Sequence, residues 1–125
     1  MQIHQSAEDY LETILMLNQR MGRVRSIDVV NELGYTKASV SIAMKKLREN
    51  GYIAVDGEGN LTLLEPGREI AERIYSRHRL LTHFFVQLGV DEEVAAEDAC
   101  KAEHILSEQT LEKIREYALL HDAQD

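Results

Sequence analysis

The sequence contains one cysteine, Cys100, one proline and no tryptophan. A single cysteine cannot form a disulfide within the chain, which indicates a reducing compartment and leaves Cys100 as either an inert buried thiol or a metal ligand. No apolar run approaches the roughly 18 residues that a membrane span needs, and residues 1–10 lack the basic-then-apolar order of a signal peptide. These absences predict a cytoplasmic protein with no membrane partner.

Positive charge is also scarce. The chain has 14 Lys and Arg residues against 22 Asp and Glu residues, which gives a formal net charge of -8 at pH 7. Non-specific affinity for nucleic acid comes from phosphate neutralisation by Lys and Arg, so this balance excludes a general binder of polyanions. Any binding to DNA must come from a local basic patch.

The chain of 125 residues is too short for a large multi-domain enzyme. Its composition, 44% hydrophobic and 29% charged, is that of an ordinary globular protein. We therefore expect the whole chain to fold, either around one core or as a small lobe with a helical extension.

The first half of the chain predicts three helices followed by a β-hairpin. Apolar residues recur at spacings of three and four over 5–21, 26–33 and 36–50. Two β-prone runs, 52–55 and 61–64, flank a turn-rich segment and form the predicted hairpin. This order is typical of a winged helix-turn-helix, in which the last helix before the hairpin enters the major groove of DNA.

Two side chains are expected to cap these helices, Ser26 for the second and Thr36 for the third. The second helix is expected to bury Ile27, Val30 and Leu33. The third helix is expected to bury an apolar stripe and to leave its lysines and serines outside.

The third helix suits DNA reading because small polar residues at its start let the backbone approach the duplex, while its lysines can meet phosphates. A solvated helix face is the competing interpretation, and the order of the elements favours DNA. The hairpin tip carries Asp56 and Glu58 and no Lys or Arg, so we expect it to have a minor role. The residues expected to contact DNA are Ser26, Thr36, Lys37, Ala38, Ser39, Ser41, Lys45 and Lys46.

The second half of the chain predicts three more helices, over 66–88, 91–105 and 107–120, with Asp91 as the cap of the middle one. Apolar residues on the last two helices exceed what one short helix pair needs to hide, which favours a homodimer. The expected dimer contacts are Val94, Leu106, Leu111, Ile114 and Leu119.

A cluster of metal-competent side chains occurs near the end of the helix predicted over 91–105. Cys100, Glu103 and His104 fall at i, i+3 and i+4, so they can converge on one side of that helix. A thiolate, a carboxylate and an imidazole are ligands of transition metals. The spacing therefore indicates a candidate metal site.

Three residues on other helices could complete the site. Asp9 and Glu12 lie three apart on the first helix, and His78 continues the apolar stripe of the fourth. Each alone has an ordinary structural explanation, as a solvated acid or a hydrogen-bonded histidine. Their joint occurrence on helices that must pack together favours a metal, because buried polar groups are costly when they are not compensated.

These residues lie in segments that resemble the family of the diphtheria toxin repressor and the manganese transport regulator, over nearly the whole chain. The segments are 6–12, 36–41, 76–81 and 99–104. The resemblance implies a homodimeric repressor that binds double-stranded operator DNA when loaded with Mn(II) or Fe(II), and that has neither an organic substrate nor enzymatic activity. It implies a metal cluster formed by Asp9, Glu12, His78, Cys100, Glu103 and His104.

The resemblance leaves the metal open between Mn(II) and Fe(II), and Zn(II) or Co(II) can also be bound in vitro. Asp9 and Glu12 resemble the manganese branch of the family. Cys100 stands where that branch has a glutamate, and resembles the iron branch. An ancillary site of the iron branch uses a Glu and a His that are Thr82 and Ala96 here, so that site should be absent or altered.

The fold class that follows is mainly α: a winged helix-turn-helix DNA-binding domain over 1–72 and a helical metal-binding and dimerisation domain over 73–125, without the SH3-like domain of longer members. Metal is expected to set the separation of the two reading helices in the dimer. Three rival functions stay open: a metal-independent winged-helix DNA-binding regulator, a small metalloenzyme and a module that binds proteins.

Overall fold

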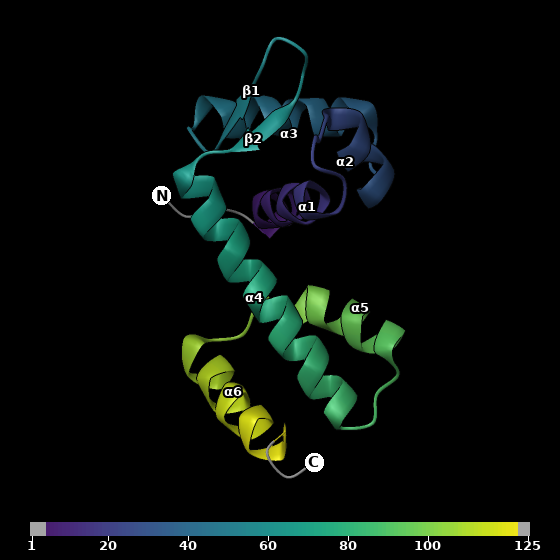
Figure 1. Ribbon diagram of the computed structural model, residues 1–125, viewed down its shortest axis with the longest axis vertical. Coiled ribbons are helices and arrows are strands. Elements are labelled where there is room, and N and C mark those ends of the chain that lie inside the picture. The colour runs from purple at the N-terminus through teal and green to yellow at the C-terminus, as the bar shows by residue number, and fades with distance from the viewer. Residues whose placement is uncertain (1–4, 123–125) are drawn as a thin grey trace. The chain divides into compact units, whose positions relative to one another are not determined.

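The computed structural model describes residues 5–122. The chain divides into two compact units, with the boundary between Arg73 and Ile74, and α4 belongs to both. None of the described helices is long and apolar enough to span a membrane. The described elements are α1 (Gln5–Met21), α2 (Ser26–Leu33), α3 (Lys37–Glu49), β1 (Ile53–Val55), β2 (Leu61–Leu63), α4 (Glu65–Gln87), α5 (Glu92–Ala102) and α6 (Glu108–Asp122) (Figure 1).

The first unit holds α1, α2, α3 and the hairpin around one apolar core. Leu11 and Ile14 of α1 are fully buried, and so is Val40 of α3. In the antiparallel hairpin, Ile53 pairs with Leu63 and both are buried. The predicted order of a winged helix-turn-helix is therefore confirmed, with α3 as the reading helix and the hairpin as the wing (Figure 1).

The wing is anchored to the loop between α1 and α2. The Leu61 amide donates to the Val24 carbonyl at 2.7 Å, and Arg25 forms an antiparallel bridge with Asn60. These contacts place a third extended segment beside β2. The base of the wing is consequently fixed to the body of the first unit by backbone hydrogen bonds.

The first turn of α4 passes close to the start of the hairpin, and Gly67 makes this approach feasible. A Cβ at this position would overlap the carbonyl oxygen of Tyr52. That carbonyl also accepts the Leu64 amide at 3.0 Å, which holds it in place. Glycine is needed here for close packing of two backbone segments.

The structure differs from the predicted capping of two helices. α2 begins at Ser26 with Arg25 in the N-cap position, and the Arg25 amide donates to Asp28 Oδ2 at 2.9 Å. Ser26 is therefore inside the helix and is not its cap. Asp91 stands at the N-cap of α5, but its side chain makes no capping hydrogen bond.

The buried face of α2 also differs from the prediction. Val29 is fully buried, whereas Ile27 is 43% exposed and Val30 and Leu33 are half-buried. Because Val29 and Val30 are adjacent, either of them can belong to an apolar face with spacings of three and four. Contacts with the rest of the unit select the face that contains Val29.

The second unit combines the rest of α4 with α5 and α6 around a small core. Leu81, Ala99 and Leu111 are buried together in it. The sequence predicted Leu111 as a dimer contact, but at 2% exposure this residue belongs to the core. Val94 and Leu119, two other predicted contacts, are exposed.

α5 ends at Ala102, three residues before the predicted end. Glu103 keeps helical backbone angles, and the chain then turns, with the Ile105 amide donating to the Ala102 carbonyl at 3.1 Å. Ser107 Oγ accepts the Thr110 amide at 3.2 Å and so caps the start of α6. A turn thus stands where the sequence predicted the last part of a helix.

Candidate functional site

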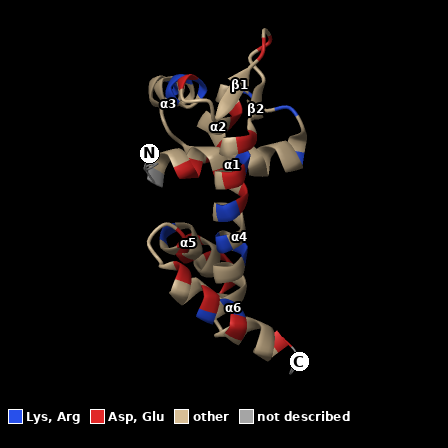
Figure 2. Cartoon of the chain, turned by 90° about the vertical axis from the view of Figure 1, so that its left-hand side faces the viewer, with Lys and Arg blue, Asp and Glu red and all other residues tan. Residues whose placement is uncertain are grey.

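α3 has one buried and one exposed face, and most of the predicted DNA contacts lie on the exposed one. Thr36 caps the helix as predicted, since its Oγ1 accepts the Ser39 amide at 3.1 Å. Figure 2 shows basic residues, in blue, gathered on α3. The exposed members of the predicted set are Thr36, Lys37, Ala38, Ser39, Ser41, Lys45 and Lys46.

The remaining predicted contact, Ser26, lies on α2, and the structure places it beside α3. Ser26, Ser41 and Lys45 line one surface hollow of about 320 Å³ in the first unit. Arg48 adds a second cation, and no acidic residue stands among the described residues that line this hollow. Two hydroxyls and two cations match the chemistry of a phosphate group.

Arg48 was not among the predicted contacts. It follows Lys45 by three positions, and Lys45 follows Ser41 by four, so all three lie along one face of α3. Helical spacing could therefore have identified Arg48 from the sequence. Ser26 could not have been joined to this face by spacing, because it belongs to another helix.

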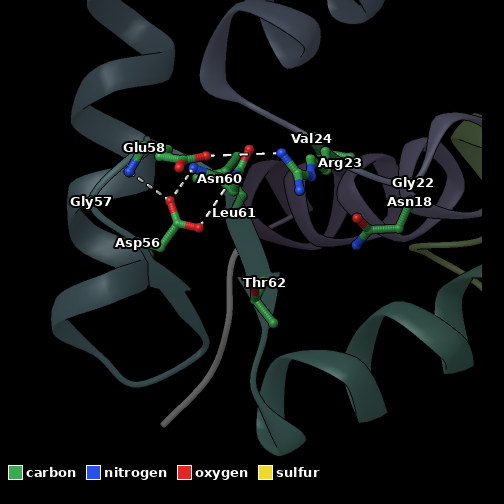
Figure 3. A pocket seen from close by; sticks show the side chains of 10 residues that line it. All are labelled: Asn18, Gly22, Arg23, Val24, Asp56, Gly57, Glu58, Asn60, Leu61 and Thr62. Atoms are coloured by element: carbon green, nitrogen blue, oxygen red, sulfur yellow. Dashed lines mark hydrogen bonds and ion pairs between the residues drawn. The ribbon is translucent and has the colours of Figure 1, made fainter.

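The wing carries the opposite charge, and one of its carboxylates is used within the turn. Asp56 Oδ1 accepts the amides of Glu58 and Asn60, each at 2.9 Å, and Oδ2 accepts Asn60 Nδ2 at 3.0 Å (Figure 3). The hydrogen bonds from Asn60, followed by the one from Glu58, hold the pKa of Asp56 below its ordinary value. The turn is therefore ordered by an ionised aspartate.

A polar hollow of about 590 Å³ opens beside this turn, between the end of α1 and the wing (Figure 3). Across it, Arg23 lies 3.9 Å from Glu58, and both side chains are largely exposed. Figure 2 shows the acidic tip of the wing in red. Carboxylates repel phosphate, so the basic face of α3 is better suited than the wing tip to meet a DNA backbone.

In the second unit, three of the predicted metal ligands lie together. His78 Nδ1 of α4 lies 3.0 Å from Glu103 Oε2, and His104 Nε2 lies 3.5 Å from Glu103 Oε1. The Glu103 side chain is fully buried, and that of His104 is 2% exposed. A buried carboxylate thus stands between two imidazoles that come from different segments.

The turn that carries Glu103 is held by an arginine that sequence reasoning missed. Arg77 of α4 donates to the Glu103 carbonyl at 3.2 Å and also pairs with Glu108 at the start of α6. Arg77 precedes His78, so the same helical turn of α4 positions both the histidine and the segment it meets. No spacing rule connects positions 77 and 103, which explains the omission.

The chemistry of this cluster fits a divalent transition metal. Glu103 Oε1 is buried and makes no hydrogen bond within the described part of the chain. A buried carboxylate oxygen without a hydrogen bond is costly, and a bound cation would reduce that cost. Imidazole nitrogens and carboxylate oxygens are both ligands of divalent transition metals.

The other three predicted ligands lie on α1 and α5, and Cys100 Sγ is within 4.8 Å of a carboxylate oxygen of Glu103. Asp9 and Glu12 belong to α1 in the first unit, where Asp9 is half-buried and Glu12 is 5% exposed. Cys100 is exposed on α5. Their part in a metal site stays a prediction from the sequence.

The ancillary metal site, which the sequence predicts to be absent or altered, has residues at its two positions that make other contacts or none. Thr82 Oγ1 donates to the His78 carbonyl at 2.7 Å, and the neighbouring His83 Nε2 lies 2.9 Å from Asp122 Oδ1. Ala96 offers no side-chain donor. His83 therefore joins α4 to α6 through Asp122.

Two family models match the chain. The model of the N-terminal DNA binding domain of iron dependent repressors matches residues 2–61, and the model of their metal binding and dimerisation domain matches residues 64–119. The two matches cover almost the whole chain, in the order in which the two units occur.

The relatives of this chain are transcriptional regulators. It is 36% identical over 113 residues to an uncharacterized HTH-type transcriptional regulator of Methanocaldococcus jannaschii, which covers 89% of this chain and 90% of the relative. It is 32% identical over 116 residues to the transcriptional regulator MntR of Escherichia coli, covering 93% and 75%. With MntR of Bacillus subtilis the identity is 35% over 109 residues, covering 87% and 77%.

Solved structures share the fold. A manganese-dependent transcriptional repressor in complex with manganese matches with a TM-score of 0.82 at 28% identity, over 90% of this chain and 52% of that one. IdeR of T. acidophilum matches with a TM-score of 0.81 at 23% identity, over 94% and 55%. This chain spans about half the length of these two structures. Because two domain models and several relatives agree along its length, the chain belongs to the iron-dependent repressor family, that of the diphtheria toxin repressor and the manganese transport regulator.

Proposed function

We propose that this protein is a metal-dependent transcriptional repressor, which binds operator DNA as a homodimer when it is loaded with Mn(II) or Fe(II) and thereby controls metal homeostasis. The observation that carries the proposal is the buried Glu103 between His78 and His104, within the segment matched by the metal binding and dimerisation domain. We place the protein in the cytoplasm and assign it no catalytic activity.

The first unit would supply the DNA contacts. α3 enters the major groove, as the second helix of a helix-turn-helix does. The small side chains of Ala38 and Ser39 let the start of α3 approach the base edges, and Lys45 and Lys46 neutralise phosphates. The chain has a net charge of -8, so this basic face directs an otherwise acidic protein onto DNA in one orientation.

The second unit would hold the metal through His78, Glu103 and His104. A divalent cation would supply the positive charge that the buried Glu103 carboxylate needs. Arg77 holds the Glu103 backbone and so keeps the carboxylate directed between the two imidazoles. Asp9, Glu12 and Cys100 are the further ligands that the sequence predicts.

The homodimer would form through the second unit. Large apolar side chains are exposed in this unit. Exposed apolar side chains that form one patch on the surface mark an interaction site. Pairing two copies would place two α3 helices on half-sites about 34–36 Å apart, one turn of DNA. The exposed apolar residues of this unit include Val94, Ile105, Leu119 and Leu120.

An anaerobic metal titration would test this function. Mn(II), Fe(II) and Zn(II) are added to the full-length chain with labelled duplexes selected from a random pool, and both metal stoichiometry and DNA affinity are recorded. We expect each activating metal to tighten DNA binding. Equal DNA affinity with and without metal would instead favour a metal-independent regulator.

The variant Cys100→Glu tests the predicted thiolate ligand in the same titration. If Cys100 binds the metal, the wild type should favour the softer ions and the variant should favour Mn(II), because thiolates prefer soft metals and carboxylates prefer hard ones. An unchanged ranking of the metals would remove Cys100 from the ligand set. The proposed function would survive that result.

A further inference from the structure

Ile42 is an exposed isoleucine on the outer face of α3. Its exposure is 59%, whereas the apolar stripe of the same helix, which includes Val40 and Met44, is buried. Isoleucine is β-branched and favours a helix less than the lysines around it do. Its presence at this position is therefore explained neither by the core nor by helix propensity.

The surroundings of Ile42 are polar and cationic. It lines the same hollow as Ser41, Lys45 and Arg48. Ser39 precedes it by three positions and Lys45 follows it by three, so both flank it along the helix surface. An apolar side chain thus stands in a face whose charge complements a polyanion.

The major groove of B-DNA offers one apolar group among its donors and acceptors, the C5 methyl of thymine. An aliphatic side chain on a helix in that groove can contact the methyl, and cytosine and purines offer no equivalent group at that place. Cations beside it can meet the phosphates that border the groove. A single isoleucine among hydroxyls and cations has this composition.

We infer that Ile42 reads a thymine methyl group in each half-site, while Ser26, Ser41, Lys45 and Arg48 seat the adjacent backbone phosphate. This inference rests on the proposed function, because it requires α3 to lie in the major groove. It separates two roles on one helix face. Ile42 sets sequence preference, and Lys45 and Arg48 set affinity that is independent of sequence.

The test replaces thymine by deoxyuridine, which lacks only the methyl group. Duplexes are first selected from a random pool by the full-length protein loaded with Mn(II). Each thymine of the selected site is then exchanged in turn. At one position per half-site we expect loss of the methyl to weaken binding by about four-fold, the effect of one buried methyl group.

The variant Ile42→Ala completes a double-mutant cycle with the deoxyuridine exchange. It should bind the thymine duplex about four-fold per half-site more weakly than the wild type, and lose nothing further when the methyl is removed. Ile27→Ala is the matched control, because Ile27 is also an exposed isoleucine of the first unit and does not line the hollow. This control should keep the full response to deoxyuridine.

Arg48→Gln tests the phosphate contact separately. It should weaken binding to thymine and deoxyuridine duplexes equally and reduce the salt dependence of binding by about one counterion per half-site. A selected duplex that is insensitive to every exchange, or an Ile42→Ala protein that keeps the wild-type response, would overturn the inference about Ile42. Failure to select any duplex would contradict the proposed function instead.

Discussion

Glu103 is the central residue of the candidate metal site in the second unit. Its carboxyl group is fully buried and is flanked by His78 and His104. A buried ionisable group of this kind favours function over stability. The residue was predicted from its spacing to Cys100 and was expected to meet His78, and the structure gives the contact between Glu103 and His78.

Replacing Glu103 by glutamine removes the charge and nearly preserves the shape. We expect Mn(II) affinity to fall by at least about ten-fold, because glutamine is a neutral ligand. The metal-free variant should unfold at the same or a higher denaturant concentration than the wild type, because the cost of burying a carboxylate is removed. Calorimetric metal titration and urea unfolding measure the two effects.

Glu97→Gln is the matched control for this prediction, since Glu97 is an exposed glutamate of α5. It should leave both Mn(II) affinity and the urea midpoint unchanged. If Glu103→Gln binds Mn(II) as tightly as this control does, Glu103 is not a metal ligand.

Gly67 illustrates a residue whose role could not be predicted from the sequence. A methyl group at this position would overlap the Tyr52 carbonyl, a backbone atom that is itself hydrogen-bonded. We expect Gly67→Ala to lower the free energy of unfolding by about 1–3 kcal/mol, as overpacking does. Gly57→Ala, where a Cβ meets nothing within 4 Å, should change it little. Equal unfolding free energies for the two variants would contradict this account.

At the scale of elements, sequence patterns predicted the helices and the hairpin better than their ends. Spacing defined the order of elements because apolar stripes extend over several turns. The ends depend on single hydrogen bonds, such as the one from the Arg25 amide to Asp28, and on tertiary contacts, such as those that turn the chain after Ala102. The sequence pattern therefore predicts helix at the short turn that carries Glu103.

The N-cap of α3 stabilises the reading helix. Thr36 Oγ1 satisfies the Ser39 amide, which would otherwise have no partner in the helix. Thr36→Ala should cost about 0.5–2 kcal/mol of unfolding free energy, and Thr36→Ser should recover most of it because serine caps equally well. Urea unfolding of the two variants and the wild type measures this. A serine variant as unstable as the alanine variant would show that capping is not the cause.

The wing turn should be sensitive to acid. The pKa of Asp56 is lowered by its hydrogen bonds in the folded chain, so its contribution is present above the ordinary aspartate pKa and is lost as pH falls through the lowered value. Between about pH 5 and about pH 3, we expect the Glu58 and Asn60 amides to lose protection from hydrogen exchange before those of α3 do.

Asp56→Ala should show this loss of protection already at neutral pH, with α3 unaffected. The variant and the wild type are compared at neutral pH and at about pH 3. Equal protection of the two wing amides in both proteins would show that Asp56 does not order the turn.

At the scale of the whole molecule, the sequence predicted one DNA-binding and one metal-binding domain, and the two family matches fall in that order. The predicted DNA contacts and metal ligands follow from spacing within helices and from the family resemblance. Spacing cannot join residues of different helices, so Arg77 and the hollow shared by Ser26 and Arg48 emerged only from the structure.

The proposed function requires that the binding of metal and the binding of DNA are coupled. Coupling is reciprocal, so the factor by which metal tightens DNA binding must equal the factor by which DNA tightens metal binding. The most direct measurement is the Mn(II) affinity of the full-length protein with and without a saturating selected duplex. We predict tighter Mn(II) binding with DNA, by a factor within about 5–150 that equals the factor found for DNA. Unchanged Mn(II) affinity on the duplex would contradict the proposed function.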